Sequence, residues 1–408
     1  MSQDRTILHC DMNGFYASVE LLQLPHLKDL PVAVCGNPES RHGIILAKND
    51  HAKKFGIVTA ETVWQAKKKC PELVLVPPHH RLYKEYSLKI NEIYLRFTDM
   101  VEPFSIDESW LDVTGSLKLF GTGKEIGDRI RELVREELGL TLSVGVSYNK
   151  VFAKMGSDYK KPDATTVISR ENYRNILWPL PVGELFFVGQ ATSEKLNQMG
   201  IATIGQLAQS QPQVLNAVFG KHGQQMYEYA NGLENSPVLR YDEQEDIKSV
   251  GNGITFRRNL EGEKDIAVAV TALADKVASR LRAGHVKCAG VKVDIKDPMF
   301  HTISRQKQLD QPTNTAVEIR DHVMDLIRKS WKLNDPIRLL TVTGINLRPE
   351  NEAVQLSLFD TVDQRREKNE KMERTMDSIR RKFGGGAITY GGLMRNDIGI
   401  DIEEEKPK

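Results

Sequence analysis

Two neighbouring acidic residues, Asp107 and Glu108, lie within an apolar, strand-like run that extends from Ser105 to Asp112. Successive side chains on a regular strand point to opposite faces, so these carboxylates converge only where the chain turns or bulges. A second apolar run, Ile7–Cys10, closes on Asp11 and then loosens, as a strand edge does at a site. We therefore expect three carboxylates at strand edges, which is enough to hold two hard cations.

Such a trio suits metal-assisted phosphoryl transfer. Two divalent ions roughly 4 Å apart clamp the attacking and leaving oxygens of an in-line displacement. Magnesium prefers carboxylates and substrate phosphates and keeps several waters, so three acids suffice as protein ligands. An Asp-Glu pair taken alone is more often a solvated surface pair. The surrounding sequence decides between the two interpretations.

Three long motifs follow one another along the chain: Cys10–Glu20, then Ser105–Glu108, then Ser143–Lys154. Together they resemble the Y-family of translesion DNA polymerases in its bacterial branch, and the similarity continues to about residue 349. The resemblance implies an α+β multidomain protein, a right-hand polymerase with a palm, small fingers and a helical thumb. Its boundaries would be palm 1–20 and 78–168, fingers 21–77, thumb 169–232, linker 233–246, little finger 247–349 and tail 350–408.

Composition agrees with this interpretation. The 408 residues exceed one ordinary domain, and 40% hydrophobic with 27% charged residues is typical of a globular protein. We expect a cytoplasmic protein with no membrane contact, because no stretch approaches 18 apolar residues and Met1–Arg5 lacks a signal peptide's apolar core. The four cysteines form no CxxC pair, which argues against a zinc site or a disulfide framework.

The positive charge is local. Net charge is only +1, yet residues 247–349 contain 18 Lys and Arg against 11 Asp and Glu. A duplex needs a basic surface rather than a basic whole protein. The same region has a β-α-β-β-α-β order of strand-like and helical segments, which favours a small sheet backed by two helices. Candidate phosphate contacts there are Arg257, Arg258, Lys292, Lys296 and Arg305.

The resemblance assigns catalysis to the acidic residues. Asp11, Asp107 and Glu108 are the catalytic residues that it implies. With the Met12 carbonyl they would hold two Mg²⁺ ions per active site. Tyr16 matches the family's steric gate, whose bulk excludes a 2′-hydroxyl and so selects deoxynucleotides.

The resemblance also implies triphosphate-binding groups. Phe15 and Tyr16 begin a helix, where free N–H groups favour phosphate. Lys53 and Lys161 would supply cations. Many relatives carry Tyr and Arg where this chain has Asp50 and Lys53, and a lysine lacks arginine's bidentate fork.

Two later segments resemble docking elements. Val188–Leu196 resembles the start of a helix-hairpin-helix, with Gly189 in the tight turn and Thr192 as an N-cap, which offers N–H groups to a DNA phosphate. In the tail, the residues that resemble a peptide for the sliding β clamp are Gln355, Leu356, Leu358 and Phe359. We expect the charged stretch Gln364–Lys382 to form a solvated helix.

The implied function is template-directed, error-prone lesion-bypass DNA synthesis on primer-template DNA with deoxynucleoside triphosphates, by a monomer. One alternative is a catalytically idle relative that binds primer-template or the clamp and recruits other proteins. Another is a nucleotide cyclase or nuclease on a similar palm, because two-metal carboxylate sites serve these chemistries as well.

Overall fold

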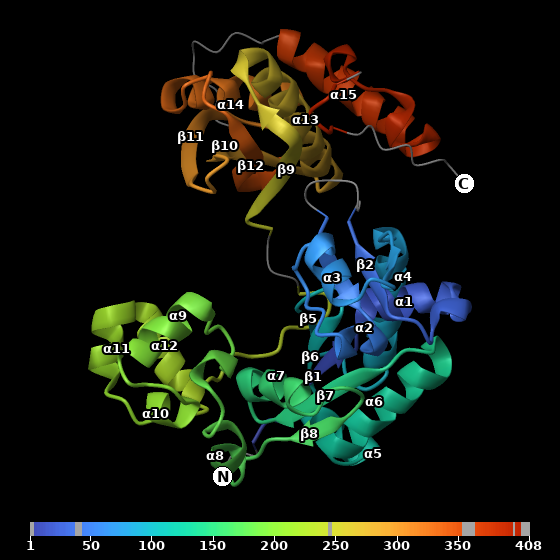
Figure 1. Cartoon of the computed structure of the whole chain (residues 1–408), viewed down its shortest axis with the longest axis vertical. Helices are drawn as coiled ribbons and strands as arrows, with labels where there is room; N and C mark the ends of the chain where they lie inside the picture. The colour runs from blue at the N-terminus through green and yellow to red at the C-terminus, as the bar shows by residue number, and fades with distance from the viewer. Residues whose placement is uncertain (1–3, 37–42, 244–246, 353–363, 395, 401–408) are drawn as a thin grey trace. The chain divides into compact units, whose positions relative to one another are not determined.

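The computed structural model describes residues 4–36, 43–243, 247–352, 364–394 and 396–400. The chain divides into two compact units, Met1–Gln244 and Glu245–Lys408 (Figure 1). Across the described ranges, we find no helix with the length and apolar character needed to cross a membrane.

The first unit is built on a five-stranded sheet with strand order β5-β6-β1-β7-β8. Neighbouring strands are antiparallel except β7 and β8, which are parallel. The central strands β1 and β7 are buried along their whole length, because helices cover both faces of the sheet. The strands are β1 Ile7–Met12, β5 Val101–Pro103, β6 Glu108–Asp112, β7 Leu142–Ser147 and β8 Thr165–Val167.

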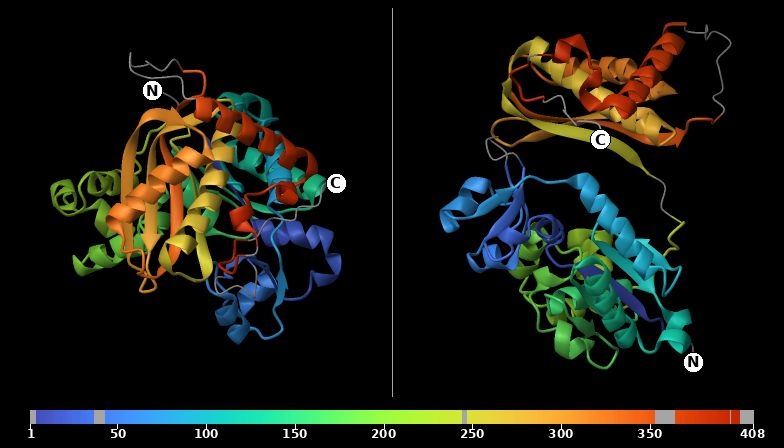
Figure 2. Two further views of the ribbon diagram at one scale, coloured as in Figure 1. Left: turned by 90° about the horizontal axis from the view of Figure 1, so that it is seen from above. Right: turned by 90° about the vertical axis from the view of Figure 1, so that its right-hand side faces the viewer.

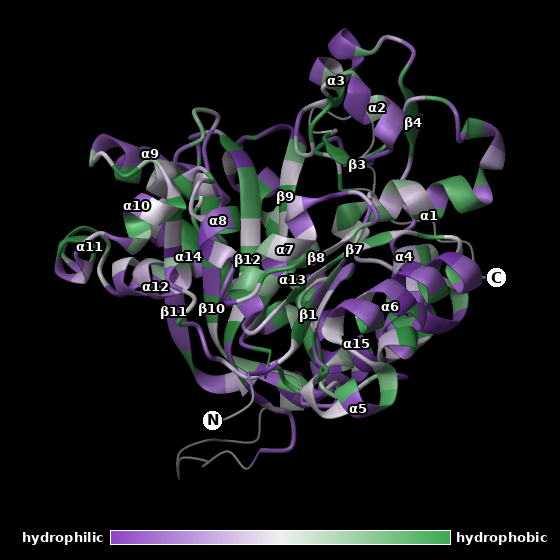
Figure 3. Ribbon diagram, turned by 90° about the horizontal axis from the view of Figure 1, so that it is seen from below, coloured by the Kyte–Doolittle hydropathy of each residue, from purple (hydrophilic) through white to green (hydrophobic). Residues whose placement is uncertain are grey.

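Helices α1 Phe15–Gln23, α4 His80–Tyr94 and α6 Gly123–Leu138 pack on one face of this sheet. Helix α6 begins at a capping box between Thr122 and Glu125, which satisfies free N–H groups of its first turn. It is amphipathic, with hydrophilic positions alternating with hydrophobic ones along its length (Figure 3). A short helix, α5 Leu117–Phe120, precedes it.

Helix α7 Lys150–Tyr159 packs on the opposite face, against β1 and β7. Its close approach depends on Gly145. A Cβ at this position would lie 1.8 Å from the Ala153 carbonyl oxygen, so any larger residue would push the helix away. Asn149 caps the helix by accepting a hydrogen bond from the Phe152 N–H (2.7 Å). The fourth and fifth residues of α7 are thereby held directly over the sheet.

A small three-stranded sheet of order β3-β2-β4 has its own core. Helices α2 and α3 accompany it, and the α3 N-terminus has a capping box formed by Thr62 and Gln65. The bounds are β2 Val32–Cys35, β3 Ile45–Lys48, β4 Val74–Val76, α2 Asp50–Lys54 and α3 Val63–Lys69.

A helical region follows β8 and has a separate apolar core. Its helices are α8 Tyr173–Leu177, α9 Gln190–Gln198, α10 Ile204–Ala208, α11 Pro212–Phe219 and α12 Lys221–Ala230. The N-cap prediction for Thr192 is wrong, because α9 begins earlier. Gly189 is the N-cap residue with an ordinary negative φ of −77°, and Thr192 lies inside the first turn. Glycine is tolerated at an N-cap almost as well as a hydroxyl residue, so the threonine gave a misleading signal.

The second unit confirms the predicted β-α-β-β-α-β order. An antiparallel sheet of order β11-β10-β12-β9 has helices on one face (Figure 2). The core lies between sheet and helices, with β10 contributing Val291, Val293 and Ile295. The bounds are β9 Ser249–Leu260, α13 Gly262–Ala283, β10 Val286–Lys296, β11 Thr302–Thr313, α14 Ala316–Ser330 and β12 Ile337–Pro349.

The predicted tail helix is present and largely exposed, but one of its faces is buried and so is not solvated as predicted. Helix α15 Gln364–Phe383 packs against α13 through Arg282, whose buried guanidinium forms ion pairs with Glu373 and Asp377. Glu373 also accepts from the Ala316 N–H at the start of α14 (2.9 Å). A run of charged residues indicates a solvated face only when no buried partner exists, and Arg282 is that partner. Beyond the helix, Leu393, Ile398 and Ile400 join the core of the unit.

Candidate active site

Two of the three predicted acids lie side by side at one end of the five-stranded sheet. Asp11 in β1 and Glu108 in β6 are direct Cα partners in the antiparallel register. The chain bends from Ser105 to Asp107 and the strand begins at Glu108, which is the turn that the adjacent acids require. The Asp107 carbonyl accepts from the Met12 N–H (3.1 Å), so the third acid is tied to the same end of β1.

The carboxylates carry protein partners. The Lys154 ammonium lies 2.9 Å from Glu108 Oε1 and 3.3 Å from Asp11 Oδ2. The Lys161 ammonium lies 2.7 Å from the same Asp11 oxygen. The Asp107 carboxylate accepts from Ser105 Oγ (2.7 Å) instead. Within the described part of the chain, no three His, Cys, Asp or Glu side chains converge as a ready-made metal site.

The donor chemistry nevertheless fits a hard divalent cation. Carboxylate and carbonyl oxygens are the ligands that magnesium takes, and Asp11, Asp107, Glu108 and Met12 supply them at one sheet end. The cations already paired with Asp11 and Glu108 show that this place attracts positive charge.

Burial and charge set the protonation of the acids. Burial raises the pKa of Asp11 to about 6, even with Lys161 and Lys154 beside it. Burial likewise raises the pKa of Asp107. For Glu108, burial is outweighed by the adjacent His9 ring and by the hydrogen-bonded ammonium of Lys154, which lower the pKa to about 2. Asp11 and Glu108 are therefore mainly ionised at neutral pH, as metal ligands must be.

His9 is a site residue that the sequence reasoning missed. It is fully buried, and its Nδ1 is 2.8 Å from Ser157 Oγ. Its Nε2 faces Glu108 Oε2 at 3.6 Å and has no hydrogen-bond partner. The available signal was its position two residues before Asp11, because residues i and i+2 of a strand share a face.

Tyr16 lines a cavity of about 410 Å³ together with Phe15, Met12 and Asp107. Its ring stacks on Tyr83, with centroids 4.0 Å apart and planes 13° apart. Tyr83 in turn donates a hydrogen bond to the buried carboxylate of Glu20. Tyr16 is thus held at the side of the cavity by an anchored aromatic partner, which the sequence did not indicate.

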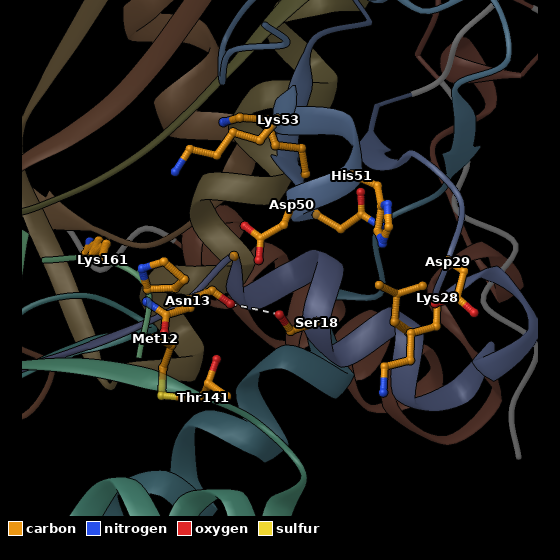
Figure 4. Close-up of a pocket in the computed structure, with 15 residues that line it drawn as sticks. Met12, Asn13, Ser18, Lys28, Asp29, Asp50, His51, Lys53, Thr141 and Lys161 are labelled. Carbon is orange, nitrogen blue, oxygen red and sulfur yellow. Dashed lines mark hydrogen bonds between the residues drawn. The ribbon is translucent and has the colours of Figure 1, made fainter. Parts of the chain in front are cut away.

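Lys53 and Lys161 line a second pocket of about 390 Å³ that also contains Asp50 and Met12. In Figure 4, Lys53, Asp50 and His51 come from α2, and Lys161 lies across from them. The pocket is therefore bordered by positive charge from two separate elements. Asp50 shares the pocket, and its carboxylate would repel a triphosphate unless it turns away from it.

Family models match three parts of the chain. Residues 10–158 match the impB/mucB/samB family, residues 247–358 match the C-terminal domain of that family, and residues 184–234 match the thumb domain of DNA polymerase-iota. The DNA polymerase IV of Acetivibrio thermocellus is 45% identical over 392 residues, covering 96% of this chain and 98% of that protein. The chain belongs to the Y-family of DNA polymerases.

Further relatives agree. The DNA polymerase IV of Moorella thermoacetica is 38% identical, with 96% of this chain and all of that protein covered. DNA polymerase IV 1 of Bacillus subtilis is 37% identical, with 97% and 94% covered. A solved Y-family DNA polymerase chimera matches the fold with a TM-score of 0.75 at 23% identity, over 84% of this chain and 99% of that one. Polymerases of this family are metal-dependent and use primer-template DNA and deoxynucleoside triphosphates.

The predicted phosphate contacts of the second unit fall into different environments. Lys292 and Lys296 project from the face of β10 opposite the buried Val293. Arg305 pairs in register with Val293 and so belongs to the helix-covered side, at the edge strand. Arg258 forms ion pairs with Asp265 and Asp397 within the unit. Arg257 sits on β9, where its N–H donates to the Ile398 carbonyl. The five residues therefore do not form one surface.

Proposed function

We propose that this chain is a template-directed DNA polymerase of the error-prone lesion-bypass type, which adds deoxynucleotides to a primer 3′-hydroxyl. The observation that carries the proposal is the pairing of Asp11 with Glu108 at a sheet end, beside a cavity bordered by Asp107 and Tyr16. The relatives named DNA polymerase IV, which match the chain over nearly its whole length, support it.

In this proposal Asp11, Asp107 and Glu108, with the Met12 carbonyl, hold two magnesium ions. Such ions, when bound, would supply Lewis-acid chemistry that lowers the pKa of the primer hydroxyl and offsets the charge of the pyrophosphate. The protein's own residues bind and orient the nucleotide. Lys53 and Lys161 pair with the triphosphate, and the N–H groups at the start of α1, at Phe15 and Tyr16, face its phosphates.

Tyr16 selects the sugar. Its stacking on Tyr83 restricts the ring, so a ribose 2′-hydroxyl meets a fixed wall rather than a side chain that can swing away. Selection by steric exclusion needs a rigid excluding group. We therefore assign Tyr16 as the steric gate.

We assign the palm to 1–20 and 78–168, the fingers to 21–77, the thumb to 169–232 and the little finger to 247–349, with a linker at 233–246 and a tail from 350. The N–H groups near Gly189 and Thr192 and the side chains of Lys292 and Lys296 in β10 would contact DNA phosphates without reading sequence. We also propose a monomer that acts in the cytoplasm.

The segment proposed to bind the sliding β clamp lies outside the described residues. It lies in the chain between β12 and α15, and its sequence combines Gln355 with the apolar Leu356, Leu358 and Phe359. An apolar pair that fills a pocket beside a polar specificity contact is a common mode of peptide docking. Loss of clamp-stimulated synthesis on removal of the Leu358 and Phe359 side chains would support this partner.

A primer-extension assay with magnesium tests the proposal. We expect Asp107→Ala to abolish synthesis and Tyr16→Ala to admit ribonucleotides. Asp99→Ala, at an acid that is 65% exposed and paired with Arg240, is the matched control for loss of an acid. Tyr16→Phe keeps the bulk of the ring and should keep the exclusion. Unchanged ribonucleotide exclusion in Tyr16→Ala would refute the gate.

The same assay separates the alternatives. A catalytically idle relative would bind primer-template without extending it, and the intact acids argue against that. A cyclase or nuclease would consume nucleotide or DNA in the absence of a primer. Incubation with a nucleotide alone therefore distinguishes these from a polymerase.

A further inference from the structure

A lysine occupies the space between the two paired carboxylates. Lys154 comes from α7, and its side chain is only 13% exposed because Gly145 lets that helix lie close to β7. Its ammonium lies 2.9 Å from Glu108 and 3.3 Å from Asp11. These two acids are cross-strand neighbours on β6 and β1. The lysine is thus part of the carboxylate site rather than of its rim.

The contacts continue into a closed ring of alternating charge. Lys154 also lies 3.5 Å from Asp158, one turn further along α7. Lys161 contacts both Asp158 (2.7 Å) and Asp11 (2.7 Å). Asp11 Oδ2 is therefore shared by two ammonium groups. Lys161 is 31% exposed and lines the second pocket, whereas Lys154 is more deeply buried.

The far side of Glu108 is also filled. His9 Nε2 faces Glu108 Oε2, and His9 is held by Ser157 and by an edge contact with Trp110 (centroids 5.3 Å apart). Lys154 contacts Oε1 of this carboxylate, and His9 lies opposite Oε2. One oxygen of Glu108 is therefore aimed at the place that the Lys154 ammonium occupies.

A divalent ion that uses Asp11 and Glu108 meets this lysine. It competes with Lys154 for the same oxygens and is repelled by the ammonium at short range in a partly buried setting, where charge interactions are weakly screened. A triphosphate would reverse the balance, because it adds negative charge and would attract Lys161, which lines the second pocket. The more buried Lys154 does not line that pocket and would stay with the carboxylates.

We propose that Lys154 is a resident counter-cation of the carboxylate site. It holds Asp11 and Glu108 together when no metal is present and weakens the binding of a lone divalent ion, so that stable metal occupation requires the nucleotide. The requirement for the nucleotide rests on the proposed function. The effect of Lys154 on metal binding without nucleotide is independent of the proposed function.

Mn²⁺ binding to the full-length protein, followed by electron paramagnetic resonance without nucleotide or DNA, tests this directly. Lys154→Met should bind Mn²⁺ at least tenfold more tightly than the wild type, and its melting temperature should rise more steeply with Mg²⁺. Lys154→Arg keeps the charge and should remain near the wild type. Lys150→Met removes a lysine of the same helix that pairs with Glu102 (2.6 Å) and should bind Mn²⁺ within twofold of wild type.

Equal or weaker Mn²⁺ binding by folded Lys154→Met would overturn the proposal. The wild type gives an independent check that needs no variant: Mn²⁺ should bind weakly alone and at least tenfold more tightly with a non-hydrolysable deoxynucleoside triphosphate. Tight binding without the nucleotide also overturns it. A protein that extends primers but fails these tests loses only the role of Lys154, whereas failure to extend primers removes the proposed function itself.

Discussion

Each unit of the molecule contains a buried cluster of opposite charges, and the two clusters differ in how completely their groups are paired. The tail cluster consists of Arg282, Glu373 and Asp377. Arg282 donates to both carboxylates and to the Asn314 carbonyl, and Glu373 accepts in addition from the backbone of Ala316. The charged groups of the tail cluster are therefore fully paired within the protein.

The site cluster of Asp11, Glu108, Lys154 and Lys161 is not saturated. His9 Nε2 lacks a hydrogen-bond partner, and two cavities adjoin the cluster. A saturated buried pair fixes how two elements dock, and breaking it is costly. An unsaturated one beside a cavity retains the capacity to take an external cation, which is the mark of a functional site.

The largest expected effect tests that distinction through activity. Asp11→Asn should lower the single-turnover rate of primer extension roughly a thousandfold or more, because it removes a metal ligand from the reacting centre. Glu373→Gln, assayed well below its melting temperature, should leave that rate nearly unchanged. A loss of less than tenfold in Asp11→Asn would mean that the site cluster is as structural as the tail cluster.

The next effect is on stability. Arg282→Met should destabilise the second unit by about 3–5 kcal/mol in urea unfolding, since Glu373 is left buried without its cation. Addition of Mg²⁺ should not restore it. Arg381→Met, at an exposed position of α15, the helix that carries Glu373, is the control and should change little. Rescue by Mg²⁺ would show that the tail cluster can also take a metal.

A smaller effect concerns how the stability of the first unit changes as the pH falls. In the folded, metal-free protein the pKa of Asp11 is raised to about 6. As the pH falls, Asp11 therefore takes up a proton in the folded state at a higher pH than in the unfolded state, which favours folding. Burial lowers the pKa of His9 to about 4, so acidification between pH 6.5 and 4 acts against folding. The two opposing contributions offset each other in the wild type.

Asp11→Asn removes the stabilisation that protonation of Asp11 gives the folded state in acid, and it leaves the destabilisation caused by His9. Between pH 6.5 and 4, in EDTA, it should lose stability relative to wild type by on the order of 2–3 kcal/mol. Chemical unfolding at a series of pH values measures the difference. His9→Asn should change the slope in the opposite direction, and parallel curves for all three proteins would contradict the assignment.

The smallest expected effect is on the salt dependence of DNA binding, and it distinguishes basic residues of the second unit that are already in ion pairs from those that can contact phosphate. Arg258 already has Asp265 and Asp397, so Arg258→Gln should leave the salt dependence of DNA binding unchanged. Lys296→Gln should reduce the logarithmic slope by about one, as expected for one phosphate contact. Fluorescence anisotropy at several salt concentrations distinguishes them, and equal slopes for both variants would remove this interface.

The sequence predicted what depends on local pattern. The apolar run ending on Asp11 and the turn before Glu108 follow from strand periodicity and from the impossibility of adjacent carboxylates sharing a strand face. The little-finger order followed from the same kind of pattern. The position of Lys154 could not be predicted, because it depends on a helix docking over Gly145, a contact between distant segments.

The failures have similar causes. Thr192 has the side chain of a cap but lies inside the helix, because the turn at Gly189 starts α9 earlier. Glu373 lies in a charged stretch, and its buried partner Arg282 is 91 residues away along the chain. Local propensity gives the likeliest environment of a residue type, and tertiary contacts override it.

The second unit is not complete at Pro349. Leu393, Ile398 and Ile400 belong to its core, and Arg282 depends on acids of α15. An exchange of this unit between relatives must therefore carry residues 364–400 together with 247–349. A graft that ends at residue 349 would leave the Arg282 guanidinium without its acidic partners Glu373 and Asp377. Any loss of synthesis by such a chimera would then reflect a destabilised unit rather than a change in DNA preference.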